Sequence, residues 1–127
     1  KTAYEISTRD WSSDVCSSDL DPIPLTQYLV STLTSDTDNL DHLNKDILYI
    51  NGDINNRALT GIVAPNFCCI KLLLNTSPTN NIVLKNQSTN SSAGNRFITI
   101  TGNDYTLSPL SSVRVLYDTN SSRWRLL

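Results

Sequence analysis

Residues 113–127 read VRVLYDTNSSRWRLL, two runs of alternating apolar and polar residues on either side of a polar turn. Alternation with a period of two is typical of strands that bury one face, and Asp, Asn and Ser favour the turn between them. The sequence therefore predicts a β-hairpin with strands over 113–117 and 123–127. Trp124 is expected to be a core or interface anchor, because its ring can bury a large apolar area while the flanking arginines face solvent.

Similar short runs recur from Asp46 onward. They are rich in Val, Ile, Leu and Phe, and Asn, Ser, Gly, Pro and Asp separate them. Strands this short, with no helical pattern between them, predict an all-β domain over 46–127, namely an antiparallel β-sandwich of jelly-roll type. The further strands are expected at 47–50, 58–63, 67–74, 82–85 and 97–101.

The segment 21–45 is less regular. It begins with two prolines and becomes acidic and polar toward its end, so we interpret it as a connector or a fragment of a preceding element. Within it, 25–33 fits a helix and a strand equally, because an apolar face at helical spacing coexists with β-branched residues.

Residues 1–20 read KTAYEISTRDWSSDVCSSDL and differ in composition from the remainder of the chain. They are polar and acidic, with neither helical nor strand periodicity. The segment resembles the in-frame translation of an indexed sequencing-library adapter, with the variable index at 7–9. We therefore expect it to be an artefact without ordered structure, and we expect that the natural start of the protein and any signal peptide cannot be judged from it.

The charge balance excludes two classes of partner. The chain has 127 residues, with 10 basic and 12 acidic side chains and a formal net charge of −2, and the charges balance once residues 1–20 are set aside. Nucleic acids and anionic membranes require clustered Lys and Arg. A membrane-spanning helix requires about 20 consecutive apolar residues. We expect neither nucleic-acid binding nor membrane insertion.

Few residues could carry chemistry. His42 is the one histidine, and we expect it to be exposed. Cys68 and Cys69 are neighbours on one predicted strand, so they point to opposite faces; we predict free thiols, with one packed in the core. Aromatic rings that could stack on a sugar, Phe67 among them, fall mostly in predicted strands, where core packing is expected.

The acidic run DTDNLD at 36–41 has a superficial likeness to a calcium loop. Leu40 stands at the third ligand position, however, and the loop lacks both its glycine and its closing acidic residue. There is no glutamate after Leu20 and no Gly-x-Ser-x-Gly motif. We predict that the protein is not an enzyme, with no catalytic residues, no cofactor and no metal.

Several short motifs follow one another in a set order between residues 46 and 127. This order resembles a β-domain of tail-fibre, baseplate and related virion proteins of tailed bacteriophages and prophages. One departure is Leu110, because such domains often have glycine after the proline at this turn. The motifs are ILYI at 47–50, RALTGI at 57–62, LLLN at 72–75, IVL at 82–84, AGNRF at 93–97, LSP at 107–109 and the hairpin at 113–125.

The resemblance implies a structural or host-attachment module without chemistry of its own, often trimeric within a larger fibre. We therefore expect a homo-oligomer located in the virion tail, with a host surface glycan as the candidate outside partner. The alternative is a carbohydrate-binding module of a secreted bacterial protein, which would be monomeric and expose a stacking aromatic ring beside polar groups. The structural signature residues are Arg57, Thr60, Gly61, Asn75, Asn95, Arg96, Tyr117, Asp118, Arg123 and Trp124.

Two of these positions carry a more specific expectation. Gly61 is predicted to mark a bend or bulge in its strand. Arg96 follows one loop and Asp118 opens the last hairpin, so a partly buried ion pair between them could tie the two loops. The competing interpretation is that both are solvated turn residues.

Overall fold

The computed structural model describes residues 28–127, so the expectations for residues 1–20 and for 21–27 lie outside the described residues. The described chain is built almost wholly of strands, with one short 3-10 turn at Ala93–Asn95, which confirms the all-β class. The strands are β1 (Tyr28–Leu33), β2 (Ile47–Gly52), β3 (Arg57–Leu59), β4 (Ile70–Asn75), β5 (Ile82–Leu84), β6 (Phe97–Ile98), β7 (Tyr105–Leu107), β8 (Ser112–Asp118) and β9 (Arg123–Leu126).

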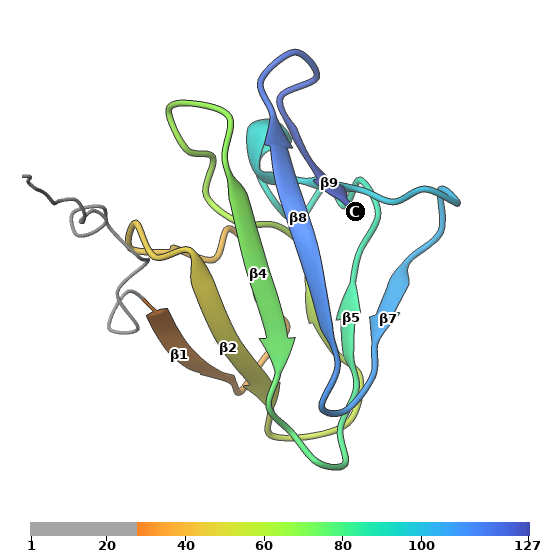
Figure 1. Ribbon diagram of the computed structural model, residues 1–127. Helices are drawn as coiled ribbons and strands as arrows, with labels where there is room; N and C mark the ends of the chain where they lie inside the picture. The colour runs from red at the N-terminus through yellow and green to blue at the C-terminus, as the bar shows by residue number, and fades with distance from the viewer. Residues whose placement is uncertain (1–27) are drawn as a thin grey trace, which may run out of the picture.

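The strands form two sheets. One has six strands in the order β1-β2-β4-β8-β9-β6, and the other has three in the order β3-β5-β7. In Figure 1, β1, β2, β4 and β8 lie side by side, and β5 and β7 stand beyond them. The expectation of a purely antiparallel arrangement is wrong, because β1–β2, β2–β4, β3–β5 and β6–β9 are parallel pairs.

The parallel pairs arise because successive segments of the chain stack on one another in the same direction. Tyr28 in β1 lies beside Ile47 in β2, which lies beside Leu72 in β4. The segments that lead from one strand of this sheet to the next stack in the same way, since Thr37, which follows β1, forms a parallel β-bridge with Leu59 of β3. Antiparallel pairing occurs where β7 joins β5, where β8 joins β4 and where β9 folds back on β8. The first half of the described chain therefore runs as stacked coils, and the predicted hairpin closes one side.

Both sheets contribute to one apolar core. Leu48 and Ile50 come from β2, Leu59 from β3 and Leu84 from β5, and all four are fully buried in the same cluster. Trp124 is also fully buried, which confirms the anchor predicted from its pattern.

The rings of Tyr117 and Trp124 meet edge to face with their centroids 5.0 Å apart. This arrangement suits the charge distribution of aromatic rings. The predicted hairpin thus exists as β8 and β9, and it places these two rings on the buried face of the six-stranded sheet.

Several strand boundaries differ from the sequence prediction. The ambiguous stretch at 25–33 is a strand over its described part, β1. The expected strand 58–63 stops at Leu59 and continues only as single bridges at Gly61 and Ile62, which places a break where the glycine indicated one. β7 was not predicted, because it is three residues long and only its last residue is buried. Among the described residues, no helix is long and apolar enough to cross a membrane.

Candidate functional site

Four signature residues meet around Ser91. The Thr60 and Ser91 hydroxyl oxygens lie 2.7 Å apart, and Arg96 Nε donates to the Ser91 carbonyl oxygen at 2.9 Å. Gly61 approaches so closely that an added Cβ would lie 2.6 Å from Ser91 Oγ and would overlap the Asn95 carbonyl oxygen. This cluster ties the loop before the 3-10 turn at Ala93–Asn95 to the segment that follows β3, so its role is structural.

Asp118 pairs with Arg125 and not with Arg96, so the expected Arg96–Asp118 ion pair is wrong. Arg125 Nε donates to Asp118 Oδ2 at 2.9 Å, Ser121 Oγ donates to the same oxygen, and the Asn120 backbone N–H donates to Oδ1. These contacts, with Arg125 first, lower the pKa of Asp118 to about 2. Arg125 lies on the neighbouring strand of the same hairpin, so it is nearer to Asp118 than Arg96, which follows another loop.

The other polar signature residues also hold loops in place. Arg57 pairs with Asp53 at 2.6 Å, and Arg123 Nε donates to the Gln87 amide oxygen at 2.8 Å. The buried Asn75 side chain donates to three backbone carbonyl oxygens of neighbouring loops. Within residues 28–127 these side chains contact loops and backbone groups, so the contacts observed for them are those of the framework.

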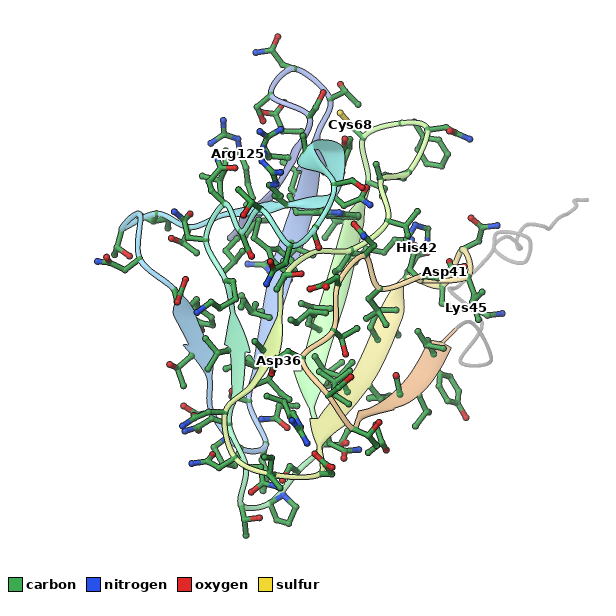
Figure 2. The ribbon with its side chains drawn as sticks, turned by 180° about the vertical axis from the view of Figure 1, so that it is seen from behind. Asp36, Asp41, His42, Lys45, Cys68 and Arg125 are labelled. Carbon is green, nitrogen blue, oxygen red and sulfur yellow. The ribbon has the colours of Figure 1, made fainter. Side chains whose placement is uncertain are left out.

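A groove of about 750 Å³ lies between the turn at 41–46 and the segment 63–71. Figure 2 shows Asp41 and His42 together on this side of the molecule, with Arg125 on the opposite side. Stacking of the chain creates the groove, because it brings the turn before β2 against the turn before β4. The polar side chains that line it are Asp41, His42, Asn44, Asp46, Asn66 and Lys71.

His42 is buried, which corrects the expectation of an exposed histidine. Its side chain is 5% exposed, and its ring lies edge-on to Trp124 with the centroids 6.5 Å apart. Nδ1 accepts the Asn44 backbone N–H at 3.0 Å, so a neutral ring carries its proton on Nε2, which finds no hydrogen-bond partner among residues 28–127. The turn at 41–46 folds back over the core and covers the ring.

Several groups act on the pKa of His42. Burial lowers it most and the positive charge of Lys71 lowers it further, while Asp41, the Val63 backbone and Asp46 oppose them. The Val63 backbone lies near the ring and favours its protonated form, but it is not placed to form a hydrogen bond with Nε2. The net effect keeps the imidazole neutral near neutral pH.

Lys71 forms the inner wall of the groove. Its side chain is 4% exposed, and its Nζ lies 3.1 Å from Asp46 Oδ1, whose own side chain is half exposed. Sequence reasoning missed this residue, although one signal was available: Lys71 shares the inward side of β4 with Leu73 and Asn75 by simple alternation.

Phe67 stands at the mouth of the groove with 66% of its side chain exposed. The expectation that it packs in the core of a strand is wrong, because β4 begins only at Ile70 and Phe67 belongs to the preceding loop. An exposed aromatic ring beside polar side chains is the feature expected of the carbohydrate-binding alternative.

The outward face of the six-stranded sheet is largely apolar over β1, β2 and β4, whereas β8 and β9 carry Arg114, Arg123 and Arg125 on the same side. Tyr28 and Val30 are 43% and 62% exposed, and the rings of Tyr28 and Tyr49 meet edge to face with their centroids 5.3 Å apart. Strand register places these side chains in adjacent rows on one surface. We call this surface the outer face; its apolar members are Tyr28, Val30, Ile47, Tyr49, Ile70, Leu72, Leu74 and Leu116.

Both described cysteines are free thiols, as predicted. Cys68 is exposed and its Sγ lies 3.4 Å from Thr119 Oγ1, a contact that lowers the pKa of the thiol. Cys69 is half-buried against the core, and burial raises its pKa.

The carboxylates of the 36–41 run are used separately. Asp36 accepts the Ala58 backbone N–H, whereas Asp38 accepts the Thr60 hydroxyl. Asp41 accepts the backbone N–H two residues further on. Within residues 28–127, no group of three or more His, Cys, Asp or Glu side chains is placed to hold a metal ion. The run therefore serves to fix the loop between β1 and β2.

Comparisons with known proteins identify no relative for this arrangement. No family model matches the chain, and no curated protein and no solved structure matches it significantly. The resemblance to virion β-domains stays a prediction, and the function is inferred below from the contacts of the described residues.

Proposed function

We propose that the protein is a non-enzymatic structural or host-attachment module of a phage tail fibre or similar virion appendage, and that it assembles as a homotrimer. The observation that supports this most strongly is the outer face. An antiparallel or mixed sheet that faces water usually carries polar residues on that side, and a contiguous exposed apolar surface marks an interaction site.

A second copy of the chain is the partner that this surface suits. The rows across β1, β2 and β4 are uncharged up to Arg114 of β8, which ends the row through Ile47 and Leu72, so this surface suits an apolar partner better than a charged ligand. Identical apolar faces related by rotation can cover one another in a closed symmetric assembly. The threefold state itself comes from the resemblance to fibre proteins.

The stacked coils support the same proposal. Parallel stacking of chain segments builds elongated β-structures in which each coil contacts only its neighbours, and β1 is the edge strand of the sheet formed by the described residues. We also propose that the two sheets form the jelly-roll-like sandwich expected from the sequence. The core that both sheets share supports a sandwich, whereas the parallel strand pairs differ from the antiparallel pairing of a jelly roll.

A monomeric carbohydrate-binding module of a secreted bacterial protein is the second candidate, and the exposed ring of Phe67 favours it. The two candidates differ in oligomeric state and in location. Both are compatible with a saccharide site, so the presence of such a site alone does not separate them.

Immunoelectron microscopy tests the virion location. Phage particles whose genome encodes this chain would be labelled with an antibody raised against the full protein. The proposal predicts label on the tail appendage of intact particles. Label confined to protein released free into the culture medium would contradict it and would favour the secreted module.

A further inference from the structure

We propose that the groove between 41–46 and 63–71 binds an uncharged saccharide. The inference deepens the attachment role and rests on the proposed function for its biological setting. The chemical argument for it uses three features that the described residues bring together: an exposed aromatic ring, a set of free polar groups and the charge balance of the groove.

Phe67 supplies the stacking surface. A pyranose ring presents a face of C–H groups that is apolar and weakly positive, and the face of an aromatic ring is weakly negative. The phenyl ring of Phe67 is two-thirds exposed and projects from the loop before β4, and half-exposed Ile70 continues its apolar surface along the groove. A large exposed apolar side chain beside a concave surface is the usual form of a binding site.

Polar side chains beside Phe67 are free to bind hydroxyl groups. The side-chain amides of Asn44 and Asn66 are exposed and make no hydrogen bond to any other described residue. Each amide can donate and accept at once, as sugar hydroxyls do. Asp46 uses Oδ1 for Lys71 and is half exposed, so its other oxygen can accept a hydroxyl proton.

The floor of the groove is rigid. Lys71 and His42 are both more than nine-tenths buried, and His42 lies edge-on to the core residue Trp124. The Asp46 carboxylate fixes the Lys71 amine, and the Asn44 backbone N–H fixes His42 Nδ1. Groups held in this way need no ordering when a ligand binds, which lowers the entropic cost of binding.

The charge of the groove selects the class of saccharide. Lys71 is compensated by Asp46, Asp41 adds a further negative charge, and the buried His42 is neutral near neutral pH. Lys45 of the same turn offsets Asp41, so among the described residues the groove has no net positive charge, and its lining includes no arginine to receive the carboxylate of a uronic or sialic acid. The groove therefore suits neutral hexoses and N-acetylhexosamines.

Titration of the ¹⁵N-labelled full chain tests this assignment. The probes are methyl glucoside, methyl galactoside and N-acetylglucosamine as neutral sugars, with glucuronate and N-acetylneuraminate as anionic ones, each at millimolar concentration. We expect shifts of the amide resonances of residues 63–71 and of the His42 ring with at least one neutral sugar. The anionic sugars should bind at least about tenfold more weakly.

Two variants localise the site. Phe67→Ala should weaken binding about tenfold or more, and Asn66→Ala should weaken it several-fold. Tyr105→Ala, which removes an exposed ring from the other sheet, should leave binding unchanged. These positions are on the surface, and unchanged spectra outside the groove would show that each variant is folded.

The proposal is overturned if no neutral sugar shifts these resonances, if Phe67→Ala binds like the unchanged chain, or if the anionic sugars bind more tightly. The readout is independent of assembly and location. A chain that binds sugar at the groove but is absent from virions would contradict the proposed function alone, and a virion protein with an inert groove would contradict this inference alone.

Discussion

The indole nitrogen of Trp124 donates a hydrogen bond to the backbone carbonyl oxygen of Ile62 at 2.8 Å in the buried core. This contact joins the last strand of the chain to the return segment that follows β3. The same ring packs against Tyr117 and lies edge-on to His42. One side chain therefore connects the predicted hairpin with the floor of the groove.

Replacement of Trp124 measures this connection. Trp124→Phe keeps an aromatic ring but leaves the Ile62 carbonyl without its buried donor, which should cost about 1 to 3 kcal/mol of unfolding free energy. Trp124→Ala also opens a cavity and should cost about 3 to 5 kcal/mol. Urea melts followed by circular dichroism would show the order of the three midpoints. An unchanged midpoint for the alanine variant would contradict the core assignment.

Gly61 and Gly94 form a matched pair. An added Cβ at Gly61 would lie 2.6 Å from Ser91 Oγ and would overlap the Asn95 carbonyl, whereas at Gly94 the nearest atom is the Tyr117 hydroxyl at 3.6 Å. Gly61→Ala should therefore destabilise the fold by about 1 to 3 kcal/mol, and Gly94→Ala should be close to neutral. Equal thermal midpoints for the two variants would show that the close approach at Gly61 is not real.

Asp118 should give a pH dependence at acid pH. Its pKa is lowered from the usual 3.8 to about 2, chiefly by Arg125. A lowered pKa in the folded state means that this stabilisation is present above 3.8 and is lost as the pH falls toward about 2. The carboxyl group remains partly accessible to water, which screens the ion pair, so the effect on stability is small. Carboxyl ¹³C titration should show the pKa of Asp118 returning toward its usual value in Arg125→Gln; no movement would contradict the pairing.

His42 should give a second pH dependence, at higher pH. Its pKa in the folded protein is lowered from 6.5, first by burial. Folding therefore favours the neutral ring, and this stabilisation is present above 6.5 and is lost as the pH falls through the lowered folded pKa. His42→Gln keeps an acceptor for the Asn44 N–H but cannot titrate. Urea midpoints at about pH 7 and about pH 5 should differ less in this variant than in the unchanged chain; an equal difference would refute the buried neutral ring.

The hairpin could be predicted because its information is local. Alternation with a period of two puts Tyr117 and Trp124 on the buried face whatever the strands pair with, and the polar residues between the runs can only form a turn. For Gly61 the sequence predicted only a bend or bulge from residue type, and for Asn75 it predicted no role beyond membership of the signature. These expectations agree with the contacts observed.

The parallel stacking could not be predicted, because alternation is the same in parallel and antiparallel strands. The groove depends on that stacking, so its residues were also missed. Phe67 was assigned to a strand that begins three residues later, and His42 was expected in solvent although the turn folds its ring onto Trp124. The burial of His42 depends on a contact between segments distant in the sequence, and the exposure of Phe67 depends on where β4 begins; local alternation determines neither.

The outer face can be tested by adding charge to it. Val30→Lys places an ammonium group on the β1 side of the apolar surface, at its most exposed member, and should dissociate the assembly, since an unpaired charge is costly at a buried interface. Ile100→Lys is the matched control, because Ile100 is 89% exposed and lies outside the outer face. Sedimentation velocity should show a smaller particle for the first variant only. Equal behaviour of the two variants would place the interface elsewhere.

The mass of the unaltered full chain in solution tests the central claim most directly. A structural module that covers its outer face with further copies should sediment at equilibrium with three times the chain mass of 14.1 kDa, and should dissociate only on dilution. A single species of 14.1 kDa at every concentration would contradict assembly through the outer face.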